Sequence, residues 1–261
     1  HGGRPRQGGR AGARPAIGDG AVRNTLNAFE NAIKENGERA DRRYTMTHVC
    51  AVADEDIKRI ADLEVISALQ FLWMYNDPLC QLEAAFIGKE RAFDMYPAKD
   101  MLEAGCLISG GSDGAVTAYD PLLEIEVGIT RNSPFPVEED EDHYRWKEQG
   151  LTAYQMLEMY TKNVAYENFM DDIVGTIETG KKADLVVIDR NILDVDPKQS
   201  LGGEGGLHRL ERRYRVRGVT SLPHEKAAAS FVLAAASRSL GFERAYSSRA
   251  SAISSVISMT W

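Results

Sequence analysis

Short apolar runs and helically spaced apolar residues alternate along the first two thirds of the chain. The runs at 44–49, 64–69 and 106–109 are long enough for buried strands. Helical spacing predicts helices over 22–33, 76–94, 97–104, 121–130 and 151–166, and another that begins at Asp54. Strands that alternate with helices are typical of parallel β/α units.

The pattern changes after residue 168. Residues 173–177 and 183–189 read as two short strands, joined by a turn at Gly180-Lys181-Lys182. They predict a small β element that follows the β/α region. Beyond residue 200 the only periodic pattern covers 227–236, where it predicts a short helix.

The composition, with 43% hydrophobic and 27% charged residues, is ordinary for a globular protein. No apolar run approaches the roughly 18–20 residues of a membrane span, and the N-terminal arginines are not followed by the apolar segment of a secretory signal. The three cysteines lack CxxC spacing, which fits a reducing compartment. We therefore expect a cytoplasmic protein without a membrane partner.

Charge divides the chain into three parts. Residues 1–14 carry four arginines and no acid, and residues 201–261 carry nine basic against four acidic residues. Residues 15–200, by contrast, hold 18 basic and 35 acidic residues. The Gly/Arg-rich start cannot build a core and lacks the interleaved aromatic residues of nucleic-acid-binding tails. We expect it to be disordered, and we do not expect nucleic acid as a partner.

Ser112-Asp113-Gly114 is the first candidate for chemistry. It follows the apolar run at 106–109 and two glycines, so Asp113 would stand where a parallel strand opens into its loop. Catalytic and metal-binding residues gather at that carboxyl edge in β/α barrels. The alternative is that Asp113 caps the following turn or helix.

His48 is the second candidate, because it ends the strand predicted at 44–49. A neutral imidazole there can bind zinc or polarise a carbonyl group, provided that a second residue orients it. The alternative is a core histidine whose hydrogen bonds are satisfied. Cys50 could join a mixed metal site, although a small buried hydrophobic residue is the favoured interpretation.

Several motifs in a fixed order carry more information than either candidate alone. Ala16-Ile17-Gly18-Asp19-Gly20, then His48, then Gly111-Ser112-Asp113 come at successive strand ends, and a helix with Tyr160-Thr161-Lys162-Asn163 follows. The last motif is Gly175-Thr-Ile-Glu-Thr-Gly180-Lys-Lys-Ala-Asp-Leu-Val-Val. Together they resemble the metal-dependent amidohydrolases of the amidohydrolase 3 group, which includes proteins like N-substituted formamide deformylase. The resemblance covers residues 15–200 and corresponds to the C-terminal part of such an enzyme.

This resemblance implies a function and a site. It implies hydrolysis of non-peptide carbon–nitrogen bonds in a small-molecule substrate. The attacking water would be activated by a divalent metal, for which zinc is the expected identity. His48 matches a metal-binding histidine at the end of a later barrel strand. Asp113 matches the aspartate after the last strand, which touches the metal and serves as general base.

The chain also departs from the family pattern. The His-x-His pair of the first barrel strand and the mid-barrel ligand have no counterpart, and Pro15 stands where the family has a histidine. Two protein ligands make a poor zinc site, since catalytic sites use three or more. A truncated, catalytically defective amidohydrolase fragment without bound metal is therefore the alternative. An incomplete barrel would need a complementary chain or a second copy to cover its edges.

These observations predict an α/β fold: the C-terminal strands of a TIM-type (β/α) barrel, followed by part of a small β-sandwich domain. The expected division is a disordered tail at 1–14, the partial barrel at 15–168, the remnant of the β domain at 169–200 and a poorly ordered basic tail at 201–261.

Overall fold

The computed structural model describes residues 13–38, 41–135, 143–182 and 192–193, together with the backbone of four further strands. Most of the two predicted tails, and the acidic segment 136–142, lie outside the described residues. The predicted disorder at the two ends therefore stays a prediction. The first strand begins at Ala13, two residues before the start of the predicted barrel.

Four parallel strands form the first sheet, in the order β1-β2-β3-β4. Their bounds are β1 Ala13–Ala16, β2 Thr45–His48, β3 Ile66–Leu69 and β4 Ile108–Gly110. Strand order follows chain order, and a helix lies between each strand and the next, so the predicted succession of β/α units is confirmed.

The helices fall at the predicted places. The α-helices are α1 Asp19–Asn36, α2 Asp54–Asp62, α3 Pro78–Ile87, α4 Lys89–Phe93, α5 Ala98–Glu103, α6 Pro121–Thr130, α7 Ala153–Glu158 and α8 Val164–Glu167. Short 3-10 turns occupy η1 Phe71–Trp73 and η2 Lys147–Gln149, and η3 Met159–Asn163 is a π-helix between α7 and α8. The helix predicted over 151–166 thus contains a π-helical turn, a feature often found at functional sites.

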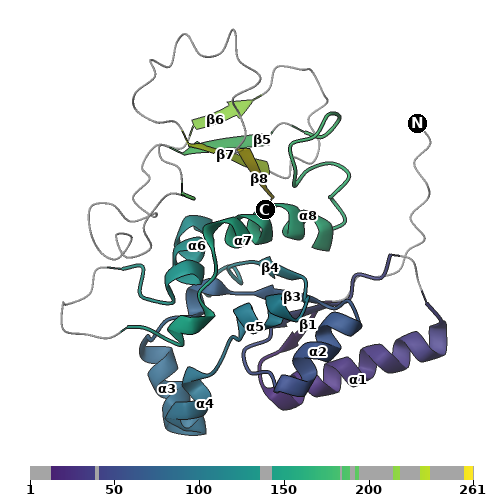
Figure 1. The fold of residues 1–261 in the computed structure, drawn as a ribbon, viewed down its shortest axis with the longest axis vertical. Helices are drawn as coiled ribbons and strands as arrows, with labels where there is room; N and C mark the ends of the chain where they lie inside the picture. The colour runs from purple at the N-terminus through teal and green to yellow at the C-terminus, as the bar shows by residue number, and fades with distance from the viewer. Residues whose placement is uncertain are drawn as a thin grey trace.

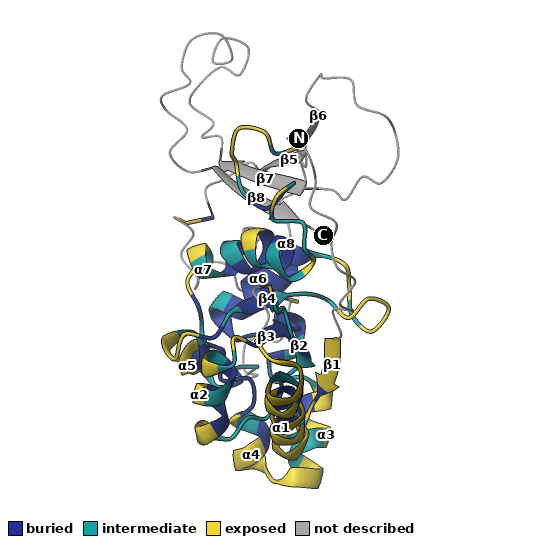
Figure 2. Ribbon diagram, turned by 90° about the vertical axis from the view of Figure 1, so that its right-hand side faces the viewer, coloured by how far each residue is buried: buried dark blue, intermediate teal, exposed yellow. Residues whose placement is uncertain are grey.

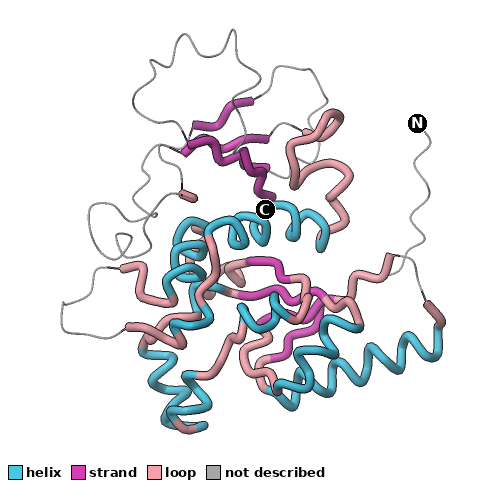
Figure 3. The backbone as a smooth tube through the Cα atoms, viewed as in Figure 1, coloured by secondary structure: helices cyan, strands magenta, loops and turns pink. Residues whose placement is uncertain are grey.

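Helices cover the first sheet on two sides. In Figures 1 and 3, α1 and α2 lie below the strands and α6, α7 and α8 lie above them. Figure 2 shows the same layers from the side, with buried residues concentrated in and around the sheet. The apolar positions of α1 that face the sheet, Val22, Leu26 and Phe29, are buried, while the rest of the helix is largely exposed.

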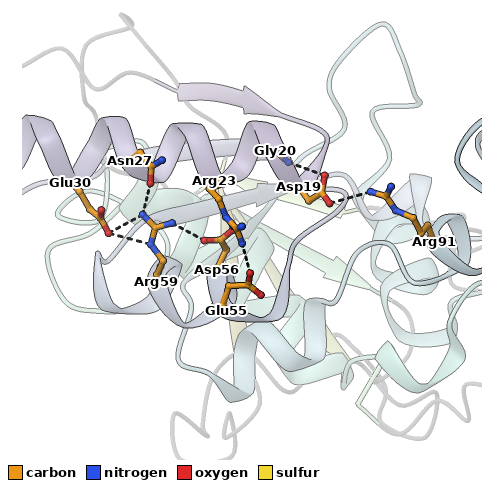
Figure 4. A network of polar contacts seen from close by, with 9 residues as sticks. All are labelled: Asp19, Gly20, Arg23, Asn27, Glu30, Glu55, Asp56, Arg59 and Arg91. Atoms are coloured by element: carbon orange, nitrogen blue, oxygen red, sulfur yellow. Dashed lines mark hydrogen bonds and ion pairs between the residues drawn. The ribbon is translucent and has the colours of Figure 1, made fainter.

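A buried carboxylate fastens α2 to α1. Asp56 is fully buried and accepts hydrogen bonds from Arg23 Nε at 2.8 Å and from Arg59 Nη1 at 2.7 Å. Arg59 also donates to Asn27 on α1, and Arg23 donates to Glu55, as Figure 4 shows. Because a buried charge without partners is strongly destabilising, the two guanidinium groups make this arrangement tolerable. The network fixes the outer helices that support the strands.

The outer edge of β4 is covered by the helical segment at 159–167. Asn163 Nδ2 donates to the carbonyl oxygen of Ile108 at 2.8 Å, and Ser109 Oγ donates to Glu167 at 2.7 Å. A strand edge left open offers unpaired backbone groups to other chains. Here Asn163 pairs with one backbone carbonyl group of β4, and Glu167 binds the side chain of the next residue, Ser109.

A second sheet of four strands follows, in the order β6-β5-β7-β8, with one parallel and two antiparallel pairings. Its strands are β5 Asp184–Ile188, β6 Tyr214–Arg217, β7 Ser230–Ala235 and β8 Val256–Thr260. The strand predicted at 183–189 is confirmed. The helix predicted over 227–236 is wrong, because β7 runs through it; pairing with distant strands overrides the helical preference of alanine.

The strand predicted at 173–177 is also wrong, because the chain turns there. The amides of Ile173 and Val174 both donate to the carbonyl oxygen of Met170, and Gly175 has a φ of 96°. A Cβ on Gly175 would lie 2.5 Å from the Cβ of Ala165, so this glycine lets the turn pack directly against α8. A glycine that allows close packing of the backbone and a positive φ is typical of a turn rather than of a strand.

The α/β fold class is confirmed, and the parallel sheet with its connecting helices is consistent with part of a TIM-type barrel. None of the helices in the described ranges combines the length and the apolar character that crossing a bilayer requires.

Candidate functional site

His48 and Asp113 both lie at the carboxyl edge of the first sheet. His48 is the last residue of β2, and its level in the sheet corresponds to Ala16 on β1. Thr47, Ala68 and Ser109 are aligned across β2, β3 and β4, so the ends of these three strands stand level. Asp113 comes three residues after the end of β4. The edge that carries chemistry in β/α folds is therefore the edge at which both candidates lie.

The imidazole of His48 is held by two residues that follow β3. Its Nδ1 lies 2.9 Å from Gln70 Oε1, and its ring stacks on Trp73 with centroids 5.3 Å apart and an interplanar angle of 9°. Gln70 is almost fully buried, and its Nε2 faces the carbonyl oxygen of Ala68 at 3.4 Å, which directs Oε1 to the imidazole. An amide oxygen can only accept, so in the neutral ring Nδ1 carries the proton and Nε2 keeps its lone pair.

The backbone at His48 is strained. Its φ is 75°, and the amide of Val49 donates to the carbonyl oxygen of Thr47 at 3.0 Å. This three-residue turn is the rare, strained form of the γ-turn. Val49 follows with a φ of 46°, an outlier for a β-branched residue, and its side chain is fully buried. Strain of this kind persists where the surroundings enforce it, and it clusters at functional sites.

Asp113 lies in a more open setting. Its φ is 53°, Ala115 two residues later has a φ of 76°, and the amide of Val116 donates to the Asp113 carbonyl oxygen at 3.0 Å. The Asp113 side chain is exposed, and no hydrogen bond to it is found within the described ranges. It does not cap a helix, since α6 begins after Asp120, whose side chain accepts from the Leu122 amide.

The structure brings the two candidates to one edge but not into contact. β2 and β4 are both neighbours of β3, so two strand spacings, about 9–10 Å, separate the strand ends from which the residues extend. Across the described part of the chain, no three side chains of His, Cys, Asp or Glu are grouped so that they could hold a metal ion. The pair remains a prediction as a metal site.

A divalent metal fits these residues in part. The free Nε2 of His48, oriented by a hydrogen bond to the opposite ring nitrogen, is the usual donor geometry for a metal-binding histidine. An exposed carboxylate such as Asp113 is a suitable oxygen donor. Pro15, in the motif at β1, pairs with Thr47 and supplies no donor. Further ligands would have to come from outside the described residues.

Cys50 does not take part. It is 1% exposed, and burial raises the pKa of its thiol to about 12. A thiol is a good ligand only as the thiolate, which such burial disfavours. The interpretation as a small buried hydrophobic residue is the one that the structure favours.

Sequence reasoning missed the residues that support the candidates. Gln70 directly follows the run at 64–69, so a polar residue at a predicted strand end was the available signal. Glu124 lies in the otherwise apolar start of α6, and the available signal was an acid within that apolar run. Its carboxylate accepts from the hydroxyl of Tyr160 at 2.7 Å and from the amide of Leu72 at 3.3 Å.

Burial dominates the electrostatics around Glu124. Removal from water raises the pKa of its carboxyl group to about 7, although the hydrogen bonds from Tyr160 and from the backbone at Leu72 and Phe71 act in the opposite direction. Burial likewise raises the pKa of the Tyr160 hydroxyl well above its usual value, and the Glu124 carboxylate adds to the effect. A carboxyl group that titrates near neutrality therefore lies next to the candidate edge.

Comparison with known proteins identifies the family. The model of the amidohydrolase family matches residues 13–206. The chain is 30% identical over 196 residues to the protein named amidohydrolase YtcJ of Bacillus subtilis (strain 168), which covers 75% of this chain and 34% of YtcJ. It is 27% identical over 184 residues to the N-substituted formamide deformylase of Arthrobacter pascens, covering 68% of this chain and 31% of the relative.

A plant relative and a solved structure extend the comparison. LONG AFTER FAR-RED 3 of Arabidopsis thaliana is 28% identical over 180 residues, covering 69% of this chain and 30% of that protein. A crystal structure of a metal-dependent hydrolase from Pyrococcus horikoshii OT3 superposes with a TM-score of 0.54 at 22% identity, over 71% of this chain and 35% of that one. The chain thus spans about a third of the length of the curated relatives it matches. By the family model that covers most of its residues, the chain belongs to the amidohydrolase family.

Proposed function

We propose that this chain forms part of a divalent-metal site in a hydrolase that cleaves non-peptide carbon–nitrogen bonds of small molecules. His48 binds the metal through Nε2, and Asp113 is both a ligand and the general base. The observation that carries the proposal is the hydrogen bond of His48 Nδ1 to Gln70 at the carboxyl edge of the sheet, which leaves Nε2 free. Membership of the amidohydrolase family supports the same reaction class.

Each residue has a definite task. Gln70 holds the proton on His48 Nδ1, and Trp73 holds the ring plane, so the Nε2 lone pair keeps one direction. A divalent cation at this position would lower the pKa of water towards neutrality. The exposed carboxylate of Asp113 can take the proton from the attacking water and return it to the leaving nitrogen.

A second candidate is a chain that holds no metal by itself. The observation that favours it is the absence, in the described ranges, of any group of three ligating side chains. Catalytic zinc sites use three protein ligands and an open position. In that case a complementary chain or a second copy would have to supply the remaining donors.

Metal content of the purified chain separates the two candidates. Elemental mass spectrometry would be applied to the chain as expressed and after zinc loading, alongside His48→Ala and Asp113→Asn. Near-stoichiometric zinc that falls in both variants supports the proposal. Zinc at background in the unchanged chain contradicts it and supports the second candidate, and zinc that both variants retain would assign the metal to other residues.

A further inference from the structure

We propose that Glu124 is a positioning residue that holds both ends of the candidate site, at β2 and at β4, and loosens them when it gains a proton. The inference rests on the proposed function, because it explains what orients His48 and Asp113. Its evidence is a buried carboxylate that contacts neither of these two residues. Nothing in the composition or in the motifs points to this role.

One contact of Glu124 leads to His48. Its Oε2 accepts from the amide of Leu72 at 3.3 Å, in the middle of the short turn η1 that follows β3. Trp73, the next residue, stacks on the imidazole, and Gln70, just before the turn, accepts from it. The carboxylate therefore fixes the turn that carries Trp73 and directly follows Gln70, the two residues that hold the ring.

The other contact leads to Asp113. The same Oε2 accepts from the Tyr160 hydroxyl at 2.7 Å, and the Tyr160 ring lies so close to Gly110 that a Cβ there would be 2.3 Å from its Cε2 and Cζ. Gly110 ends β4, three residues before Asp113. The ring thus limits where the loop after β4 can begin, and Tyr160 itself belongs to the π-helical turn η3.

The protonation state of the Glu124 carboxyl group matters because only one of its two oxygens makes hydrogen bonds within the described residues. Glu124 is 1% exposed, and within the described residues Oε1 accepts no hydrogen bond. Ionised, Oε2 is a strong acceptor for both donors. Protonated, the group is a weaker acceptor, so the bonds to Leu72 and Tyr160 weaken together.

Few charged groups act on this carboxyl group from the elements around it. Asp120, at the start of the same helix, favours the protonated form by repulsion, and Tyr160 faces the group from η3. Leu72 and Phe71 from η1 present backbone amides. Within the described residues burial is the largest influence on the pKa of this carboxyl group, and the hydrogen bonds from Tyr160, Leu72 and Phe71 oppose it.

The test follows the backbone amides of Leu72 and Gly110 by NMR from pH 5 to pH 9. In the unchanged chain both amide signals should inflect together, near pH 7. In Glu124→Gln, which keeps the shape and an acceptor oxygen, both inflections should vanish. In Tyr160→Phe, which removes a bond to the ionised form, the Leu72 inflection should move to higher pH while that of Gly110 is lost.

Two control variants keep the result specific. His48→Gln removes the imidazole from the β2 end, and the shared inflection should persist in it. Glu148→Gln changes an exposed carboxylate at η2 and should leave both signals as they are. An inflection that persists in Glu124→Gln, or one that appears at Leu72 and not at Gly110, would overturn the proposal.

The pH dependence of zinc affinity distinguishes a positioning role of Glu124 from a purely structural one, which would leave it unchanged. Between pH 6 and pH 8 the affinity of the unchanged chain for zinc should rise several-fold more than that of Glu124→Gln. Equal pH profiles would overturn the positioning role. If the unchanged chain binds no zinc at all, the proposed function fails, and the two amide signals alone decide whether Glu124 couples the strand ends.

Discussion

The ends of β2 and β4 carry the two candidate residues, and they are built differently. His48 has a hydrogen-bonded imidazole stacked on Trp73, whereas the carboxylate of Asp113 is exposed and has no hydrogen bond within the described residues. Both have a positive φ, 75° and 53°. The β2 end is therefore prepared in advance, while the β4 end keeps freedom that a ligand would have to remove. Preorganisation of this kind reduces the entropy lost on binding.

The largest expected effect concerns zinc. His48→Ala should reduce zinc retention to background, a loss beyond the ~10–100-fold that removal of an outer-shell partner causes. Asp113→Ala should have a smaller effect, because the free carboxylate loses mobility when it binds and so contributes less net free energy. Isothermal titration with zinc at pH 8 measures both.

The comparison between the two strand ends fails if Asp113→Ala lowers zinc affinity more than His48→Ala does. A greater loss with Asp113→Ala would mean that the β4 end dominates the site in spite of its exposure. Asp113→Asn is the matched control, because it keeps the side-chain volume and tolerates a positive φ while it removes the charge.

A second prediction concerns the carboxyl group between the two ends. The pKa of Glu124 is raised from 4.5 to about 7 in the folded chain, so folding favours the protonated form. Its contribution to stability is complete below pH 4.5 and is lost as the pH rises through about 7. At 1.36 kcal/mol per pKa unit, the loss amounts to about 3 kcal/mol between pH 4.5 and 8.

Denaturant unfolding at a series of pH values checks this sign. Glu124→Gln should flatten the fall in the free energy of unfolding between pH 5 and pH 8. Glu148→Gln, an exposed change, should leave the slope as it is. If the free energy of unfolding instead rises between pH 5 and pH 8, and this rise is lost in Glu124→Gln, then folding lowers the pKa of Glu124 rather than raising it.

The sequence was sufficient for the parts of the fold that depend on local pattern. The β2 and β4 strands, the helix from Pro121 to Thr130 and the positions of His48 and Asp113 at strand ends follow from apolar runs and helical spacing. Gln70 and Glu124 were not predicted as supporting residues, because their partners lie 22 and 36 residues away in the chain. Long-range hydrogen bonds leave no periodic trace.

The two wrong elements have the same physical origin. Residues 230–235 form a strand because other strands pair with them, and residues 173–177 turn because Gly175 packs on Ala165. In both cases the deciding contact is made outside the short run of residues from which the element was predicted, so local propensity does not contain it.

A third prediction tests how far Gln70 prepares the β2 end. Gln70→Leu keeps the volume and removes the acceptor for Nδ1, so the imidazole is free to change tautomer. Zinc affinity should fall by about 10–100-fold. Gln70→Glu keeps an acceptor oxygen and should restore most of it. Unchanged affinity in Gln70→Leu would show that stacking on Trp73 alone orients the ring.

The smallest effect concerns backbone strain after β4. Ala115 is exposed and has a φ of 76°, a conformation that disfavours every residue with a Cβ. Ala115→Gly should therefore raise the free energy of unfolding by up to about 1 kcal/mol. The matched control is Ala28→Gly in the exposed face of α1, where the same change should lower the free energy of unfolding by about 1 kcal/mol.

The β2 end should respond to glycine in the opposite way. His48→Gly relieves the same kind of strain, but it also removes the hydrogen bond to Gln70 and the stacking on Trp73. A typical hydrogen bond contributes about 1 kcal/mol and an aromatic pair about 0.5–1.5 kcal/mol, so the loss exceeds the relief. Urea unfolding should then show glycine stabilising the loop after β4 and destabilising the end of β2. Stabilisation at both positions would mean that the contacts of His48 do no more than balance its strain, and that neither end is prepared in advance.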